Sequence, residues 1–190
     1  MNELKDYANI FEGIQPFAGE VSGGYLVDFL GTRTNADFRS MFGVEPASVG
    51  GASVQTNVPT ITDGEGWFEA VNWIAAAREA KNRYVMVTLG ACYGAQAVGS
   101  YRALQAINPM PYKLVAVEPE PKNYEWTAQH MRDNGIDPDG QWLLPFAISD
   151  RNEPVYFPVG SPGTGAQNCY STIVRGSRIL CSGAVSCGEC

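Results

Sequence analysis

The chain has 190 residues, a length that fits one domain of ordinary size or two small ones. Hydrophobic residues make up 45% of it, which is enough for a sizeable core and excludes disorder of the whole chain. The formal charge of −7 argues against nucleic acids and anionic membranes as partners, because both bind positively charged surfaces. No apolar run approaches the roughly 18 residues of a membrane span, and the first residues do not resemble a signal peptide. We therefore expect a cytoplasmic protein.

Metal and redox chemistry find little support in the sequence. A single histidine, His130, excludes sites built from several histidines, and we expect it at an exposed or helix-capping position. Four of the five cysteines lie near the end of the chain, where Cys187 and Cys190 have the spacing of a metal knuckle or a redox pair. Because Cys190 is also the last residue, we interpret these cysteines as reduced thiols and predict no metal site.

Residues 1–65 form an N-terminal extension without a regular pattern. Residues 4–11 predict a helix, and the apolar run at 25–30 predicts a strand. The stretch 44–64 contains only two charged residues and shows no periodicity. Long stretches of this kind are usually functional lids or disordered connectors, and we favour a lid or a wall beside the substrate.

From residue 66 onward, predicted helices and strands alternate. The helices are expected at 67–82, 98–107 and 124–131. The strands are expected at 84–89, 113–117 and 142–148, with an antiparallel ribbon at 155–157. The strands are continuously apolar, which is typical of strands buried on both faces of a parallel sheet. This order predicts a right-handed α/β sheet in a second unit over 66–190.

The residues that follow each strand carry the strongest functional signal, because ligands of open parallel sheets bind at the carboxyl edge. After the first strand, residues 90–94 (Gly-Ala-Cys-Tyr-Gly) lead directly into a helix, so the backbone can turn tightly and approach a ligand. After the second strand come Glu118 and Pro119, and a carboxylate there can accept both hydroxyl protons of a ribose. Residues 146–150, at the end of the third strand, are placed to cover an adenine. The pattern therefore suggests a nucleoside cofactor.

Two nucleoside cofactors compete for this site. A dinucleotide site prefers G-x-G-x-x-G, whose middle glycine leaves room for the pyrophosphate, whereas here Cys92 stands between Gly90 and Gly94. S-adenosylmethionine has no pyrophosphate, so it tolerates a bulkier turn and still needs the acid after the second strand. A glycine-rich turn also occurs for packing alone. The motif by itself therefore leaves three interpretations open, namely a dinucleotide site, an S-adenosylmethionine site and a purely structural turn.

Several segments in a fixed order carry a family resemblance. They are Val87–Gly94, Val117–Pro121, Asn134–Gly135, Ala147–Asp150 and Val155–Phe157. Over about residues 66–160 the chain resembles the FkbM-family methyltransferases. The resemblance implies a class I enzyme with a Rossmann-like three-layer sandwich that uses S-adenosylmethionine and mostly methylates oxygen. It also implies the cofactor contacts, with the methionine part beside Gly90, Ala91, Cys92 and Gly94, the ribose at Glu118 and Pro119, and the adenine near Ala147.

Two differences from the family shape the prediction. Thr88 stands where the family usually has an acid, and the sequence ends at Cys190 before the further strands of the family's sheet. The resemblance thus implies a truncated domain with an exposed sheet edge, through which copies would associate into a homo-oligomer. We expect methyl transfer to a hydroxyl of a sugar or natural product as the small-molecule acceptor, with the general base not identified. The alternative is a non-catalytic, methyltransferase-like binding or assembly module, and NAD-dependent oxidoreduction is a third reading.

Other conspicuous residues receive structural interpretations. We interpret Asn108 and Pro109 as the end of a helix, and Asp150 as a turn residue rather than a general base. Residues 160–167 fit a plain surface loop at least as well as a loop that closes over the substrate. The tryptophans are expected in the core or half-buried, namely Trp67, Trp73, Trp126 and Trp142.

Overall fold

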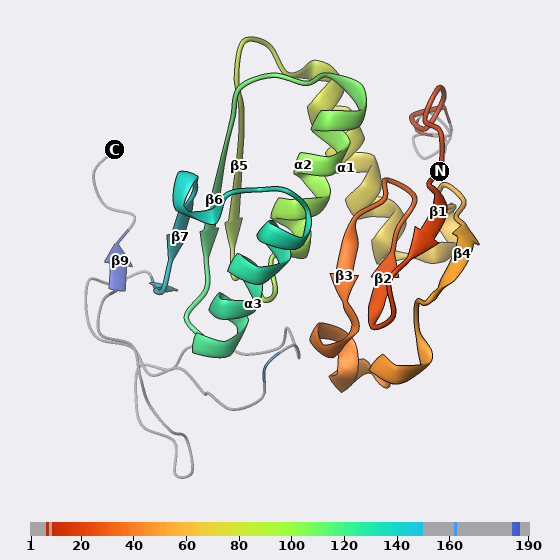
Figure 1. The fold of residues 1–190 in the computed structure, drawn as a ribbon. Coiled ribbons are helices and arrows are strands. Elements are labelled where there is room, and N and C mark those ends of the chain that lie inside the picture. The colour runs from red at the N-terminus through yellow and green to blue at the C-terminus, as the bar shows by residue number, and fades with distance from the viewer. Residues whose placement is uncertain (1–6, 8, 150–161, 163–183, 187–190) are drawn as a thin grey trace.

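The structure is a computed structural model that describes residues 7, 9–149, 162 and 184–186 (Figure 1). Its centre is a parallel sheet with the strand order β5-β6-β7. These strands are β5 (Tyr84–Leu89), β6 (Tyr112–Val117) and β7 (Trp142–Leu144), and the helices around them are α1 (Glu65–Glu79), α2 (Ala95–Ile107) and α3 (Pro121–Asp133). The predicted α/β class is confirmed, and each of these helices and strands overlaps a predicted one.

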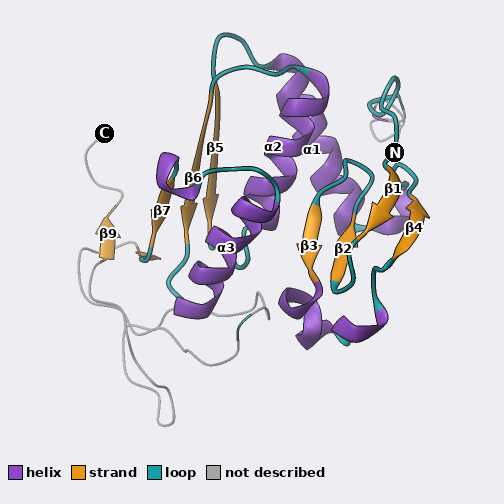
Figure 2. Ribbon diagram, viewed as in Figure 1, coloured by secondary structure: helices purple, strands orange, loops and turns teal. Residues whose placement is uncertain are grey.

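All three helices lie on one side of the parallel sheet (Figure 2). The chain passes from β5 through α2 to β6, and from β6 through α3 to β7, so both crossovers move in the same direction along the sheet. Right-handed crossovers of this kind place their helices on the same face. The helices lie between the parallel sheet and a group of N-terminal strands, which together make three layers (Figure 1).

No described helix covers the opposite face of the parallel sheet, and two predictions about burial in this sheet are wrong. Val85, Val87 and Leu89 of β5 are half or more exposed, although the apolar run predicted burial on both faces. Trp142 of β7 is 60% exposed, although we expected it to be at least half-buried. Because the described helices cover only one face of the sheet, the apolar run of β5 correctly predicted a strand but not burial on both of its faces.

Close contact between α1 and α2 depends on small residues. A Cβ at Gly99 of α2 would lie 2.5 Å from the ring of Trp73 on α1, so only glycine fits. At the far ends of these helices, the side-chain amide of Asn108 donates to the carbonyls of Ala77 and Ala80, both at 3.0 Å. Asn108 thus ends α2, as predicted, and also binds the last turn of α1.

The N-terminal strands form two antiparallel pairs. β1 (Ala18–Val21) pairs with β4 (Ala52–Gln55), and β2 (Tyr25–Val27) pairs with β3 (Arg33–Asn35). The predicted strand at 25–30 is shorter because Asp28 turns the chain, accepting hydrogen bonds from the amides of Leu30 at 2.9 Å and Thr32 at 2.8 Å. N-terminal residues share one core with α1, α2 and β5, and its buried side chains include Phe11, Phe29, Leu30, Trp67, Ile74, Tyr84 and Leu104.

The buried face of α3 is largely polar, and the prediction for His130 is wrong. His130 is 1% exposed and lies with Asn123 and Thr127 on this buried face. The side chain of Asn134, just after the helix, accepts from the amide of Arg33 and donates to its carbonyl, both at 2.8 Å. Because β3 packs here, side chains that would be solvent-exposed on an isolated helix are buried.

The predicted third strand is divided by Pro145. β7 ends at Leu144, and β8 (Ala147–Ser149) then pairs in parallel with β9 (Ala184–Ser186). The predicted ribbon at 155–157, Asp150 and the four late cysteines lie outside the described residues, as do most of 160–167 and half of 4–11. No helix in the described part of the chain is long and apolar enough to span a membrane.

Candidate functional site

The ends of the three parallel strands are joined by backbone hydrogen bonds. The amides of Gly90 and Ala91, just after β5, donate to the carbonyl of Val117 at 2.9 and 3.0 Å. The amide of Glu118, just after β6, donates to the carbonyl of Leu144 at 3.0 Å. Two of the segments that the sequence placed at the carboxyl edge, those after β5 and β6, therefore lie together there, and we call residues 90–94 the glycine turn.

The glycine turn has a left-handed backbone at three positions. Gly90 has φ +79° and Gly94 has φ +81°. A Cβ at Gly94 would lie 2.9 Å from the side chain of Thr127, so this glycine lets the turn approach α3. At Gly90 a Cβ would meet no heavy atom within 4 Å, which leaves open space beside the backbone. Cys92 has φ +51°, an uncommon conformation for a residue other than glycine.

Glu118 holds the glycine turn in place. Its Oε2 accepts a hydrogen bond from the amide of Cys92 at 2.6 Å, and its Oε1 accepts one from the amide of Glu120 at 3.0 Å. The side chain is only 4% exposed, and burial is the main cause that raises the pKa of its carboxyl above the ordinary value. The sequence predicted a ribose ligand for this carboxylate. The structure adds a role that spacing alone did not indicate, which is to connect the turn to the start of α3.

The carbonyls of the glycine turn are bound by α3. The hydroxyl of Thr127 donates to the carbonyl of Cys92 at 2.8 Å, and Nδ1 of His130 lies 3.1 Å from the carbonyl of Tyr93. Since a carbonyl only accepts, Nδ1 carries the proton, and Nε2 accepts from the hydroxyl of Thr34 at 3.2 Å. Burial lowers the pKa of His130 to about 4, which keeps the ring neutral. His130 thus connects the N-terminal strands to the turn.

An aromatic group covers the outer side of the glycine turn. The ring of Phe38, which is 2% exposed, packs against Tyr93 at 5.7 Å and Trp126 at 5.0 Å between ring centroids. The guanidinium of Arg39 donates to the hydroxyl of Tyr93 at 3.4 Å. Sequence reasoning missed Thr34, Phe38 and Arg39, because they lie in a segment without periodicity and meet the turn only through the fold.

The remaining predicted site residues lie around this arrangement. Ala91 is buried within the turn, and Pro119 is half-buried directly after Glu118. Ala147 is buried in β8, beyond the end of β7. In the described part of the chain, the hydrogen bonds that join the turn to Glu118 do not extend to Ala147. The structure therefore brings the turn and the acid together, and leaves the adenine contact at Ala147 a prediction.

A cavity of about 570 Å³ lies where the N-terminal segment meets α1. It is lined by the end of β2, by residues 56–60 and by the first turns of α1, where Glu69 and Trp73 face it. The side-chain amide of Gln96, two residues after the glycine turn, donates to Glu69 and accepts from the indole of Trp73 at 2.7 Å. The predicted wall at 44–64 thus contributes residues to a cavity, and α2 connects that cavity to the turn. We call it the α1 cavity.

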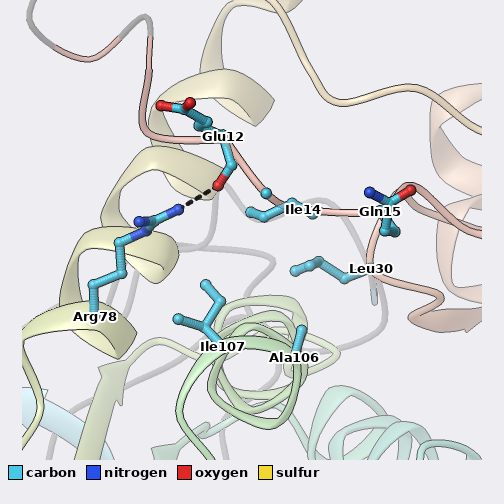
Figure 3. A pocket seen from close by; sticks show the side chains of 8 residues that line it. Glu12, Ile14, Gln15, Leu30, Arg78, Ala106 and Ile107 are labelled. Carbon is cyan, nitrogen blue, oxygen red and sulfur yellow. Dashed lines mark hydrogen bonds between the residues drawn. The ribbon is translucent and has the colours of Figure 1, made fainter.

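A second cavity of about 380 Å³ lies at the opposite end of the helices (Figure 3). The side chains of Ile14, Leu30 and Ile107 gather around it, and Arg78 donates to the carbonyl of Glu12 at 2.7 Å beside it. Ile107 is the last residue of the 13-residue helix α2, so this cavity is about 20 Å from the glycine turn. It belongs to the edge of the sheet where the strands begin.

Comparisons with protein-family models, with curated protein sequences and with solved structures found no match. Among the residues that the structure describes, no group of three or more His, Cys, Asp or Glu side chains is arranged to hold a metal ion. The geometry of the carboxyl edge is therefore the basis of the function proposed below.

Proposed function

We propose that the chain binds S-adenosylmethionine at the carboxyl edge and transfers its methyl group to a hydroxyl oxygen. The observation that carries the proposal is the 2.6 Å hydrogen bond between the amide of Cys92 and the carboxylate of Glu118. It joins the turn after one parallel strand to the acid after the neighbouring strand. This is the region of an open α/β sheet where nucleoside cofactors bind.

The residues at this edge suit an adenosine-type ligand in two respects. Open space beside Gly90 allows a ligand to approach the backbone closely, and the turn leads into the N-terminus of α2. The carboxylate of Glu118 has about four acceptor sites, and the amides of Cys92 and Glu120 and the side chain of Asn123 use three of them, which leaves one for a ribose hydroxyl.

The chemistry needs alignment more than covalent help from the protein. When bound, S-adenosylmethionine supplies an electrophilic methyl group on a sulfonium. The protein orients the cofactor and the acceptor hydroxyl in line, and orientation of this kind contributes about 7–11 kcal/mol toward lowering a barrier. Removal of the hydroxyl proton by a positioned base adds about 10²- to 10⁴-fold in rate.

The direct test is calorimetry with S-adenosylmethionine and with its demethylated product, S-adenosylhomocysteine. We expect saturable heat from both, and weaker binding in Glu118→Gln than in Glu125→Gln. Glu125 is a suitable control because it makes an exposed ion pair with Lys122 on α3. No heat from either ligand, on a sample shown to be folded, would end the proposal.

A non-catalytic module is the second candidate, and one observation favours it. The protein's own amides already occupy both oxygens of Glu118, so the carboxylate has a complete structural role without a ligand. This candidate predicts a stable fold and no response to S-adenosylmethionine, so the same titration separates the two. A titration with NAD tests oxidoreduction at the same site.

A further inference from the structure

The α1 cavity combines apolar walls with carboxylates. Phe29 and Trp73 supply aromatic surface, while Asp28, Asp63 and Glu69 supply acidic groups. The described residues that line it include no lysine or arginine. A cavity with this lining disfavours anionic ligands and suits a ligand with an apolar face and several hydroxyl or amino groups.

The acidic groups of the cavity differ in their surroundings. Backbone and hydroxyl hydrogen bonds from Thr60 lower the pKa of Asp63, so this carboxyl is held in its charged form. Asp28 is committed to the turn after β2, since its Oδ1 accepts two backbone amides. The pKa of Glu69 is raised mainly by burial and secondly by the negative charge of the neighbouring Glu65. A carboxylate with this tendency to take up a proton is suited to act as a general base.

Among the carboxylates that line the cavity, Glu69 is the one whose contacts lead toward the proposed cofactor site. It accepts a hydrogen bond from Gln96 in the first turn of α2, directly after Gly94. Tyr93, in the glycine turn, and Arg39 both interact electrostatically with Glu69. The cavity and the carboxyl edge are therefore neighbours across the start of α2.

We propose that the α1 cavity binds the methyl acceptor, a neutral or amine-bearing sugar or similar polyol, and that Glu69 is its general base. This inference rests on the proposed methyltransferase function. The acceptor oxygen attacks the methyl carbon, so that a C–O bond forms while the C–S bond breaks. The electron pair of the broken bond stays on sulfur, which becomes a neutral thioether, and the hydroxyl proton passes to the carboxylate of Glu69.

The test uses two variants of α1 with matched controls on the same helix. Gly66 lines the cavity, and a Cβ there would meet no heavy atom within 4 Å, so Gly66→Leu places a side chain in the cavity. Its control, Asn72→Leu, adds the same side chain at an exposed position of α1 that does not line the cavity. Glu69→Gln removes the base, whereas Glu79→Gln makes the same change at the exposed end of α1. The probes are methyl glucoside, glucosamine and glucuronate, followed by amide and indole NMR shifts and by methyl transfer from labelled S-adenosylmethionine.

We expect methyl glucoside or glucosamine to shift the indole resonance of Trp73, and glucuronate to have no effect. Gly66→Leu should abolish that shift and Asn72→Leu should keep it. Glu69→Gln should slow methyl transfer by about 10²-fold or more without changing cofactor affinity, and Glu79→Gln should leave both unchanged.

Three outcomes would overturn the inference. They are the absence of any shift with all three probes, an equal response to glucuronate, and full methyl transfer in Glu69→Gln. Cofactor binding is measured separately by calorimetry, so intact binding with no sugar response refutes the acceptor cavity while the proposed function stands. Sugar binding without any cofactor binding refutes the proposed function and the base assignment together.

Discussion

Replacing Glu118 tests whether one carboxylate holds the carboxyl edge together. Glu118→Ala removes the acceptor for the amides of Cys92 and Glu120, at 2.6 and 3.0 Å. A hydrogen bond to a charged group contributes about 1.5–3 kcal/mol, so the two bonds together contribute about 3–6 kcal/mol. Burial of the carboxylate offsets part of this gain, as its raised pKa shows, and we expect a net loss of about 2–4 kcal/mol.

The loss is measured by urea unfolding followed through tryptophan fluorescence, and by calorimetric melting. For a chain of this size, 1 kcal/mol shifts the Tm by about 2–4 °C, so Glu118→Ala should lower it by roughly 4–16 °C. Glu118→Gln keeps one acceptor and turns an NH₂ toward the other amide, so its loss should be about half as large. Glu125→Ala removes an exposed ion pair and should cost about 0–1 kcal/mol.

The pH dependence of the Glu118 difference has a defined sign. A carboxyl whose pKa is raised in the folded state binds its proton more readily there than in the unfolded chain. Its stabilising contribution is therefore complete below the ordinary value of 4.5 and declines as the pH rises through the folded pKa. Wild type should gain stability over Glu118→Gln as the pH falls from 7 toward 4.5. If Glu118→Ala costs no more than Glu125→Ala, the proposed role of Glu118 is wrong.

Three further changes test the packing around the glycine turn. Gly99→Ala places a Cβ 2.5 Å from the ring of Trp73 and should cost about 1–3 kcal/mol in urea unfolding, whereas Gly66→Ala, in open space, should not destabilise. The left-handed backbone at Cys92 costs a residue with a Cβ about 1–2 kcal/mol, so Cys92→Gly should keep or raise the Tm and Cys92→Val should lower it. A higher Tm for Cys92→Val than for Cys92→Gly would contradict this backbone conformation. The neutral ring of His130, with its pKa lowered to about 4, contributes stability that is present above 6.5 and is lost as the pH falls to about 4. Wild type should therefore lose about 3 kcal/mol of unfolding free energy over this pH range, and His130→Gln should not show this loss in urea unfolding. The same dependence of unfolding free energy on pH in wild type and in His130→Gln would refute the prediction.

The central elements were predictable because their signals are local. β5 has the predicted bounds, 84–89, because its six-residue apolar run is rich in β-branched residues, is followed by a glycine and is too short for a typical helix. α3 ends at Asp133, and Gly135, with φ +76°, stands at the predicted position after the helix. The meeting of the glycine turn with Glu118 was also predictable, because parallel strands bring their carboxyl ends to one edge.

The N-terminal strands and the buried polar face of α3 were not predictable in the same way. β1 and β4 pair across 30 residues of intervening chain, and each is too short to show a period. His130 looked solvent-exposed because polar residues usually are, yet its ring is satisfied by Thr34 and by the carbonyl of Tyr93. Burial of a polar side chain depends on partners far away in the sequence, and a single pattern does not reveal them.

The same long-range partners determine the shape of the glycine turn. Glycine spacing marks where the turn lies, but the left-handed conformation of Cys92 is held from both sides, by Glu118 at its amide and by Thr127 at its carbonyl. His130 extends this network to Thr34 in the N-terminal strands. A turn held in this way has its conformation before any ligand arrives, so binding there does not bear the cost of ordering it. The N-terminal segment therefore helps to form the carboxyl edge as well as the wall of the α1 cavity.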